Sequence, residues 1–84
     1  VSGDSMKEAG IHSGDLLIVD RSLTASDQKI VIASIHGELT VKRLRKIKNE
    51  IFLMPENSSY PPIPITEEMA FEVWGVVTFV IHSL

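Results

Sequence analysis

A chain of 84 residues, 44% of them hydrophobic, is long enough for one compact domain and too apolar for a disordered tail. Its net charge of −3 argues against binding nucleic acid through bulk electrostatics, and the absence of cysteine excludes disulfides, thiolate nucleophiles and cysteine-bound metals. No apolar stretch reaches the roughly 18 residues of a membrane span and no signal peptide is evident, so we expect a cytoplasmic protein.

The first residues predict a bend followed by a single helical turn. Asp4 or Ser5 is expected to cap this helical turn. Gly10 is expected to end it, because glycine accommodates the left-handed backbone found at helix ends. The Ser-Gly-Asp sequence at residues 13–15 then predicts a second bend, which leads into the first strand.

Runs of β-branched and aromatic residues, separated by glycine, proline and asparagine, predict short strands along the rest of the chain. These strands are expected over residues 16–19, 30–35, 39–44, 51–54, 71–74 and 76–81. Residues 36–38 (His-Gly-Glu) are typical of a tight turn, so the second and third strands should form a hairpin. A break or bulge is expected at Gly75. Residues 55–64 hold all four prolines and predict an ordered surface loop.

The expected fold is therefore mainly β. We expect a small, strongly bent, partly closed β-sheet assembly of short strands, with at most one short helical turn. No internal repeat or low-complexity segment divides the sequence, so residues 1–84 are expected to form a single domain.

Ser5 is the first candidate for chemistry. It follows a bend that contains Gly3, which permits a backbone conformation that exposes the serine hydroxyl and directs nearby amides into one space. A nucleophile with an adjacent oxyanion site requires such an arrangement. The same pattern is also typical of a serine in a turn or a helix cap, and this feature alone leaves both interpretations open.

Lys42 is the second candidate. In a strand over residues 39–44, Thr40, Lys42 and Leu44 share one face. If that face is packed, loss of water lowers the pKa of the lysine from about 10.4 toward neutrality, where its amine can act as general base for a serine. Thr40 would then orient the amine by a hydrogen bond. Alternatively, Lys42 belongs to the solvated basic run over residues 42–48 and extends its head to water.

Four segments resemble successive signatures of the LexA/UmuD family of self-cleaving serine peptidases. They occur in the expected order and extend over nearly the whole chain: residues 1–6 (VSGDSM), 14–20 (GDLLIVD), 40–44 (TVKRL) and 55–58 (PENS). The interval from Ser5 to Lys42 is also similar to the serine-to-lysine interval of the family. Residues 3–6, Asp20 and the short C-terminus resemble UmuD more than LexA.

The resemblance implies an autoproteolytic serine endopeptidase with a Ser-Lys dyad on a LexA/signal-peptidase-like β fold. Ser5 matches the family nucleophile and Lys42 its general base. The main-chain amides of Asp4 and Ser5 match the oxyanion site, and Thr40 is the residue expected to orient the lysine. No cofactor and no metal ion is expected.

The resemblance also implies partners. Members of the UmuD branch cleave their own N-terminal arm when a RecA–single-stranded DNA filament promotes it, in the SOS response to DNA damage. The product forms a dimer that joins an error-prone translesion DNA polymerase. We therefore expect a homodimer, the RecA filament as co-activator and the polymerase catalytic subunit as partners, with no membrane and no strong direct binding of nucleic acid.

The position of the scissile bond departs from the family pattern. Family members carry an Ala-Gly or Cys-Gly bond on an arm well upstream of the catalytic serine. Ala9-Gly10 begins only four residues after Ser5, too close to fold back into the same site, and is interpreted as a helix end. The chain is therefore expected to be a core that lacks its N-terminal arm and does not cleave itself.

Two rival hypotheses accompany the enzyme. In the first, the domain is a binding module, a dimeric polymerase accessory subunit whose dyad has already served in processing, and the apolar run over residues 76–81 supplies an interface strand. In the second, it is the C-terminal self-cleavage and dimerisation domain of a LexA-type transcriptional repressor. A helix-turn-helix segment upstream in the full gene product would favour the repressor.

The remaining features receive structural interpretations. Three histidines are isolated in sequence and lie at no metal-ligand spacing: His12, His36 and His82. Of these, His82 is placed at a frayed chain end. The basic run over residues 42–48 is interpreted as a solvated hairpin. Three aromatic residues in the predicted strands could form an exposed contact patch, but in so small a protein they are assigned to the core: Phe71, Trp74 and Phe79.

Overall fold

Six antiparallel strands form one open sheet in the computed structural model, which describes residues 3–84. The strands are β1 (Leu16–Asp20), β2 (Ile30–Ile35), β3 (Glu38–Ile47), β4 (Glu50–Met54), β5 (Ile63–Pro64) and β6 (Glu72–Ile81). Their order in the sheet is β1-β6-β2-β3-β4-β5, so β1 and β5 are its two edges. Among these described residues, the helical part is limited to two 3₁₀ turns, η1 (Lys7–Ala9) and η2 (Glu67–Met69).

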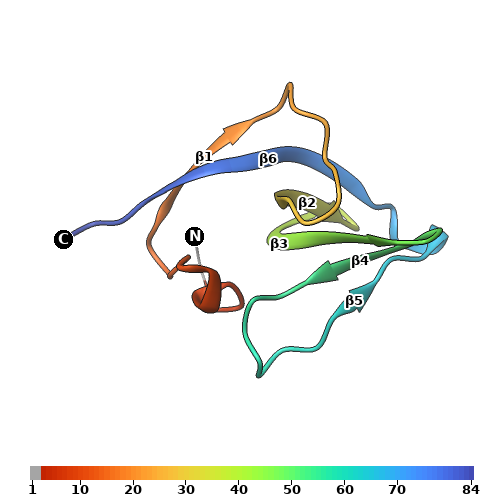
Figure 1. Cartoon of the computed structure of the whole chain (residues 1–84), viewed down its shortest axis with the longest axis horizontal. Coiled ribbons are helices and arrows are strands. Elements are labelled where there is room, and N and C mark those ends of the chain that lie inside the picture. The colour runs from red at the N-terminus through yellow and green to blue at the C-terminus, as the bar shows by residue number, and fades with distance from the viewer. Residues whose placement is uncertain (1–2) are drawn as a thin grey trace.

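The sheet bends strongly without closing. Figure 1 shows β6 as a long curved strand that crosses the molecule, while β4 and β5 diverge from it on the far side of β2 and β3. The mainly β, strongly bent fold expected from the sequence is confirmed, but the second 3₁₀ turn, η2, exceeds the single helical turn that was expected. Val1 and Ser2, which open the segment around Ser5, lie outside the described residues.

The hairpin of β2 and β3 forms as predicted. Ile35 pairs with Glu38, which leaves a loop of two residues. These two residues, His36 and Gly37, have φ angles of 50° and 82°, as the commonest two-residue hairpin turn requires. The strand β3 then continues beyond the predicted end at Leu44, because its basic residues keep pairing with β4.

The predicted surface loop after β4 ends in a short strand. Ile63 and Pro64, its last two residues, form β5 and pair with Leu53 and Phe52. Proline is tolerated here because β5 is an edge strand, where the missing N–H interrupts no interior ladder. The loop therefore returns the chain to the sheet directly after passing the N-terminal segment.

A bulge forms in β6 next to Gly75, as predicted. Ile32 pairs with Gly75 and Ala33 pairs with Val73, so Trp74 is the extra residue. Gly75 is buried, and a Cβ atom there would lie 2.5 Å from Cγ1 of Val19. Only glycine permits this close approach of β1 and β6.

We expect Gly75→Ala to destabilise the domain by about 1–3 kcal/mol through overpacking. Urea denaturation of the wild type, Gly75→Ala, Val19→Ala and the double variant measures the effect. Because Val19→Ala removes the atom that the new methyl group would meet, the double variant should lose less stability than the two single changes together. Strictly additive losses would show that this contact is not the cause.

The core lies where β2, β3, β4 and β6 meet. Five buried side chains form one cluster there: Val31, Ala33, Leu44, Leu53 and Val76. Leu44 is two residues from Lys42 on β3, and Val31 pairs with Lys42 across the ladder. The packing that stabilises the sheet therefore also holds the strand that carries the candidate base.

The cap predicted for the first helical turn is wrong. The turn η1 follows Met6, which makes no side-chain cap hydrogen bond. The backbone N–H of Lys7 donates to the Asp4 carbonyl at 3.2 Å instead. The side chains of Asp4 and Ser5 are engaged by residues distant in sequence and so do not cap. Gly10 ends the turn with a φ of 82°, as predicted.

The assignment of Trp74 and Phe79 to the core is also wrong. Trp74 is 40% exposed and Phe79 is 68% exposed, whereas Phe71 is half-buried and packs against the core. The guanidinium of Arg21 lies 4.3 Å above the Trp74 ring, and its Nε donates to the Trp74 carbonyl at 3.0 Å. The bulge gives the tryptophan a cation–π contact at the surface in place of a core position.

Candidate active site

Ser5 lies in the bend that precedes η1. Gly3 has a φ of 88°, a left-handed conformation that glycine adopts without strain, and the bend predicted from it is present. Met6 is 3% exposed and fixes the far side of the bend, where its sulfur accepts the backbone N–H of Glu56 at 3.3 Å. Between these two residues, Ser5 is half-buried and faces a cleft.

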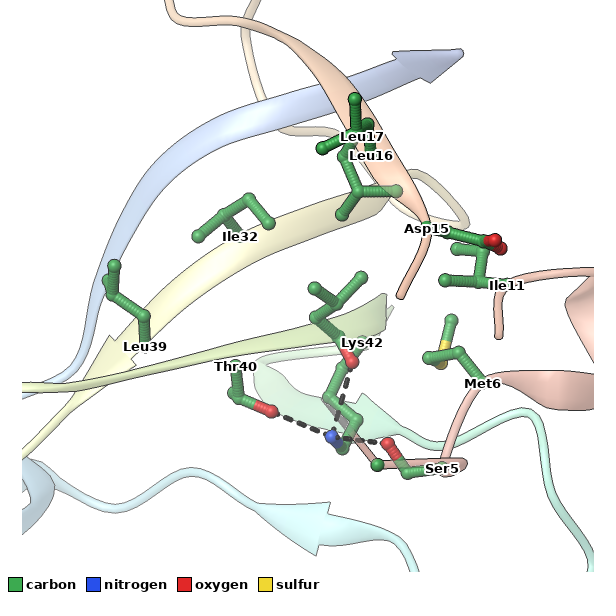
Figure 2. Close-up of a pocket in the computed structure, with 12 residues that line it drawn as sticks. Ser5, Met6, Ile11, Asp15, Leu16, Leu17, Ile32, Leu39, Thr40 and Lys42 are labelled. Carbon is green, nitrogen blue, oxygen red and sulfur yellow. Dashed lines mark hydrogen bonds between the residues drawn. The ribbon is translucent and has the colours of Figure 1, made fainter. Parts of the chain in front are cut away.

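Lys42 reaches the same place from the middle of β3. Its Nζ lies 2.9 Å from Oγ of Ser5, a residue 37 positions away in the chain. Two further hydrogen bonds join Nζ to Oγ1 of Thr40 at 2.7 Å and to the carbonyl oxygen of Val41 at 3.1 Å. Figure 2 shows the lysine amine between Thr40 and Ser5. The face shared by Thr40 and Lys42 is thus as predicted.

Burial distinguishes Lys42 from the rest of the basic run. The residue is only 8% exposed, so the interpretation in which it extends into water is wrong. Loss of solvent lowers the pKa of its amine below the ordinary value of 10.5. The three contacts of Nζ are all to uncharged oxygens, so none of them offsets this loss with a full negative charge. At a given pH, a larger fraction of Lys42 is therefore neutral than of a lysine exposed to water.

The other basic side chains of the run remain close to the surface. Nε of Arg43 is paired with the carboxylate of Glu56. Arg45 lies 3.1 Å from Asp27, whose pKa is lowered because its carboxylate accepts the backbone N–H of Lys46. These acidic partners make this part of the strand a mixed-charge surface.

The cleft at the dyad has a volume of about 390 Å³ and an apolar wall. Ser5, Thr40 and Lys42 form its polar end. The apolar lining comes from β1, β2, β3 and the N-terminal segment: Met6, Ile11, Leu16, Leu17, Ile32, Leu39 and Val41. Figure 2 shows these side chains around the space above the lysine amine. A concave, mostly apolar cleft with a few polar groups is typical of a ligand-binding site.

A cluster at the rim of the cleft was missed by the sequence analysis. Nδ1 of His82 lies 2.9 Å from the carboxylate of Asp15, and the rings of His12 and His82 are 5.9 Å apart. The placement of His82 at a frayed end is therefore wrong. The backbone N–H of His12 holds the pKa of Asp15 below its usual value. Among residues 3–84, no group of histidine and acidic residues is arranged to hold a metal ion.

Pairing of β1 with β6 explains this cluster. Asp15 directly precedes β1 and His82 directly follows β6, and the first ladder pair joins Leu16 to Ile81. The two residues become neighbours only when β1 pairs with β6. No local pattern indicates that pairing.

The loop after β4 supplies a second set of residues that the sequence analysis assigned no role. Asn57 is 4% exposed, and its amide nitrogen donates to the carbonyl of Asp4 at 2.9 Å. The hydroxyl of Tyr60 donates to the Asp4 carboxylate at 2.6 Å, which raises the pKa of the tyrosine. Asn57 lies in the PENS segment, so the resemblance drew attention to this loop without indicating its contact with the turn before Ser5.

The structure thus places a buried lysine on β3 beside a serine in an apolar cleft. The comparisons with known proteins identify the family of the chain. The model of the Peptidase S24-like family matches residues 1–78. The chain therefore belongs to the Peptidase S24-like family of self-cleaving serine peptidases. The resemblance to the LexA/UmuD family seen in the sequence is confirmed.

The relatives come from both branches of that family. The chain is 52% identical over its full length to the protein MucA of Salmonella typhimurium, and 50% identical over 96% of its length to the protein SamA of strain LT2 of that species. It is 46% identical over 90% of its length to LexA repressor 2 of Pseudomonas syringae pv. tomato. MucA and SamA are UmuD-like, in agreement with the branch predicted from the sequence.

The chain spans about half the length of the curated relatives that it matches. It covers 56% of MucA, 55% of SamA and 38% of LexA repressor 2. Within residues 3–84, no helix is long and apolar enough to cross a membrane.

Proposed function

We propose that this domain is a serine endopeptidase in which Ser5 is the nucleophile and Lys42 the general base. The observation that carries the proposal is the distance of 2.9 Å between Nζ of a buried lysine and Oγ of a serine that faces a cleft. A candidate base must first lie within hydrogen-bond reach of the proton it removes. It must then be neutral near the working pH, which the burial of Lys42 favours.

The contacts of Lys42 suit a neutral amine. Such an amine has two N–H donors and one lone pair. The Val41 carbonyl can only accept, so it takes one N–H, and Oγ1 of Thr40 takes the other. The lone pair is then directed to the hydroxyl proton of Ser5. Thr40 accordingly acts as the orienting residue expected from the sequence.

The chemistry follows in two steps. Lys42 takes the hydroxyl proton as Oγ of Ser5 attacks a peptide carbonyl, and the main-chain N–H groups of Asp4 and Ser5 stabilise the oxyanion. The resulting ammonium then protonates the leaving amine, which leaves an acyl-enzyme. Water attacks the ester carbonyl and gives a proton to the amine, and the proton returns to Ser5 as the new acid departs.

A peptide that spans an Ala-Gly bond tests this function. The domain is incubated with excess peptide at increasing pH, beside Ser5→Ala and a matched Ser13→Ala control that alters an exposed serine elsewhere. Cleavage by the wild type and Ser13→Ala, and none by Ser5→Ala, is the expected result. Cleavage by Ser5→Ala at the wild-type rate would contradict the proposal. Absence of any cleavage at high pH and high peptide concentration would favour the binding module instead.

The proposed biological role is that of a UmuD-like protein in the SOS response, supported by the similarity to MucA and SamA and by the shared motifs. The RecA–single-stranded DNA filament acts as co-activator of self-cleavage, and the product joins an error-prone translesion DNA polymerase. Cleavage of the full-length gene product with and without the filament tests the first part. Co-purification of the cleaved form with the polymerase catalytic subunit tests the second.

Homodimerisation is part of this proposal, and an apolar strip supports it. The strip consists of two cross-strand pairs on β1 and β6, Leu16 with Ile81 and Ile18 with Phe79. All four side chains are exposed, and β1 is an edge strand. Exposed apolar surface of this kind is typical of a protein–protein contact, and a second copy covers it through a two-fold axis.

We expect Phe79→Glu to weaken the dimer at least about tenfold, since a two-fold axis brings the two new charges near each other. The monomer should remain folded because Phe79 is exposed. Sedimentation equilibrium measures the dissociation constant, and Leu23→Glu, at an exposed leucine outside the strip, is the matched control. Equal dissociation constants for Phe79→Glu and the wild type would exclude this strip as the interface.

A further inference from the structure

Hydrogen bonds join the loop between β4 and β5 to the N-terminal bend and to η1. None of these bonds involves the side chain of Ser5 or Lys42. The backbone N–H of Glu8 donates to the Glu56 carbonyl at 2.8 Å, and the backbone N–H of Ser58 donates to the Glu8 carboxylate at 2.9 Å. Between them, the amide nitrogen of Asn57 donates to the Asp4 carbonyl at 2.9 Å. Figure 1 shows this loop beside the N-terminal turn.

The side chain of Asn57 is itself held in one orientation. Its Oδ1 accepts the backbone N–H of Ser59 at 2.9 Å, while its nitrogen faces a carbonyl oxygen. The opposite amide orientation would place donor against donor and acceptor against acceptor, so the contacts determine which atom is which. Because the residue is only 4% exposed, water cannot easily replace either partner.

The carbonyl that Asn57 holds belongs to the peptide group that joins Asp4 to Ser5. In a planar trans peptide, the carbonyl and the following N–H point to opposite sides. The Asp4 oxygen accepts from both Asn57 and the backbone N–H of Lys7, at 2.9 and 3.2 Å. With both lone pairs engaged, the plane of this peptide is fixed, and so is the direction of the Ser5 N–H.

We propose that Asn57 is a positioning residue of the peptidase site, which orients the Ser5 amide as an oxyanion donor by holding the Asp4 carbonyl. This inference rests on the function proposed above. Ser5 lines the cleft whereas Asn57 does not, so Asn57 acts through the peptide group and not by contact with substrate. An amide is suited to the task because it donates to the carbonyl on one side and accepts from its own loop on the other.

Asn57→Asp tests the proposal because the two side chains have nearly the same shape. The carboxylate replaces the donor with an acceptor, which repels the Asp4 carbonyl and frees the peptide plane. We expect kcat for the Ala-Gly peptide to fall about 10- to 100-fold, as for a displacement of up to about 1 Å at the reacting groups. The KM should stay at the wild-type value, because the apolar wall is unchanged. The added carboxylate would raise the pKa of Lys42, so the pH at which kcat/KM is half-maximal is compared in the uncharged variant Asn57→Ala, where it should stay at the wild-type value.

A peptide boronic acid with the same sequence gives a second readout. Oγ of Ser5 adds to the trigonal boron, its proton passes to Lys42, and a boronate oxygen takes the place of the oxyanion. Affinity for this compound should fall by the same factor as kcat. Affinity for the ordinary peptide, measured in the Ser5→Ala background, should not change. A merely structural role for Asn57 would weaken both affinities together.

Tyr60→Phe is the matched control, since it removes the other side-chain contact to Asp4 without touching the peptide carbonyl. It should keep kcat within about twofold of the wild type. Circular dichroism and urea denaturation establish that each variant is folded. Should Asn57→Asp not fold, Asn57→Ala, which removes the donor without adding a charge, carries the same test.

Two results would overturn the inference while leaving the proposed function intact. One is a folded Asn57 variant with wild-type kcat, and the other is a loss of kcat without any loss of boronate affinity. In both cases the wild type would still cleave and Ser5→Ala would not. Cleavage by Ser5→Ala, in contrast, would refute the proposed function before Asn57 is considered.

Discussion

Replacing Lys42 with methionine should slow cleavage of the Ala-Gly peptide by at least about 100-fold and leave the domain folded. Methionine keeps the length and much of the packing of the buried stem but cannot accept the proton of Ser5. Loss of a general base reduces the rate by about 10²- to 10⁴-fold. The matched control is Lys29→Met, at an exposed lysine outside the cleft, which should cleave like the wild type. Cleavage by Lys42→Met at the wild-type rate would assign the base to another residue.

The pH dependence of the wild type should report on the same group. Below the pKa of Lys42 the amine is protonated and inactive, and above it the neutral amine accepts the serine proton. The cleavage rate should therefore rise with pH and level off at a midpoint below the ordinary lysine value, since burial lowers the pKa of Lys42. A rate that falls with rising pH would contradict a lysine base.

Stability should change in the matching direction. Because the pKa of Lys42 is lower in the folded state than in the unfolded state, the unfolded chain binds more protons between these two values. The free energy of unfolding should therefore rise with pH through that window. Below the folded pKa, the full cost of burying the charged amine destabilises the domain. Lys42→Met should remove this rise and be at least as stable as the wild type at neutral pH. Urea midpoints measured across pH test both statements.

Leu53→Ala should lower the free energy of unfolding by about 2–5 kcal/mol, a large share of the few to roughly 13 kcal/mol expected for a domain of this size. Leu53 is fully buried on β4 and pairs with Leu44 on β3 and with Ile63 on β5. Truncation removes its contacts and leaves a cavity that the surrounding sheet cannot fully close. Urea denaturation measures the loss.

Leu23→Ala is the control for this prediction, since Leu23 is 48% exposed and its truncation should cost little. A loss below about 1 kcal/mol for Leu53→Ala would show that the sheet collapses around the missing methyl groups. The effect should also reach the site, because β4 leads directly into the loop that holds Asn57. Partial unfolding of this hairpin would release the Asp4 carbonyl and reduce cleavage before the whole domain unfolds.

Local chemistry explains which parts of the fold could be predicted. The alternation of β-branched and polar residues indicates strands wherever one face is packed, and the turn at His36 and Gly37 needs only two residues with positive φ. The side-chain period of a strand likewise placed Thr40 and Lys42 on one face. The cap of η1 could not be predicted in this way, because distant residues engage the side chains that were expected to form it.

The sequence by itself therefore determined the strands, the hairpin and the position of Thr40 and Lys42 on one face of the same strand, because these depend on neighbours along the chain. It also indicated Ser5 and Lys42 as candidate site residues through motifs shared with a family. Only the tertiary structure decided that Asn57 holds the carbonyl before Ser5, a contact between residues 53 positions apart. It also decided the exposure of Phe79. Both depend on which strands and loops become neighbours, and no local periodicity encodes that choice.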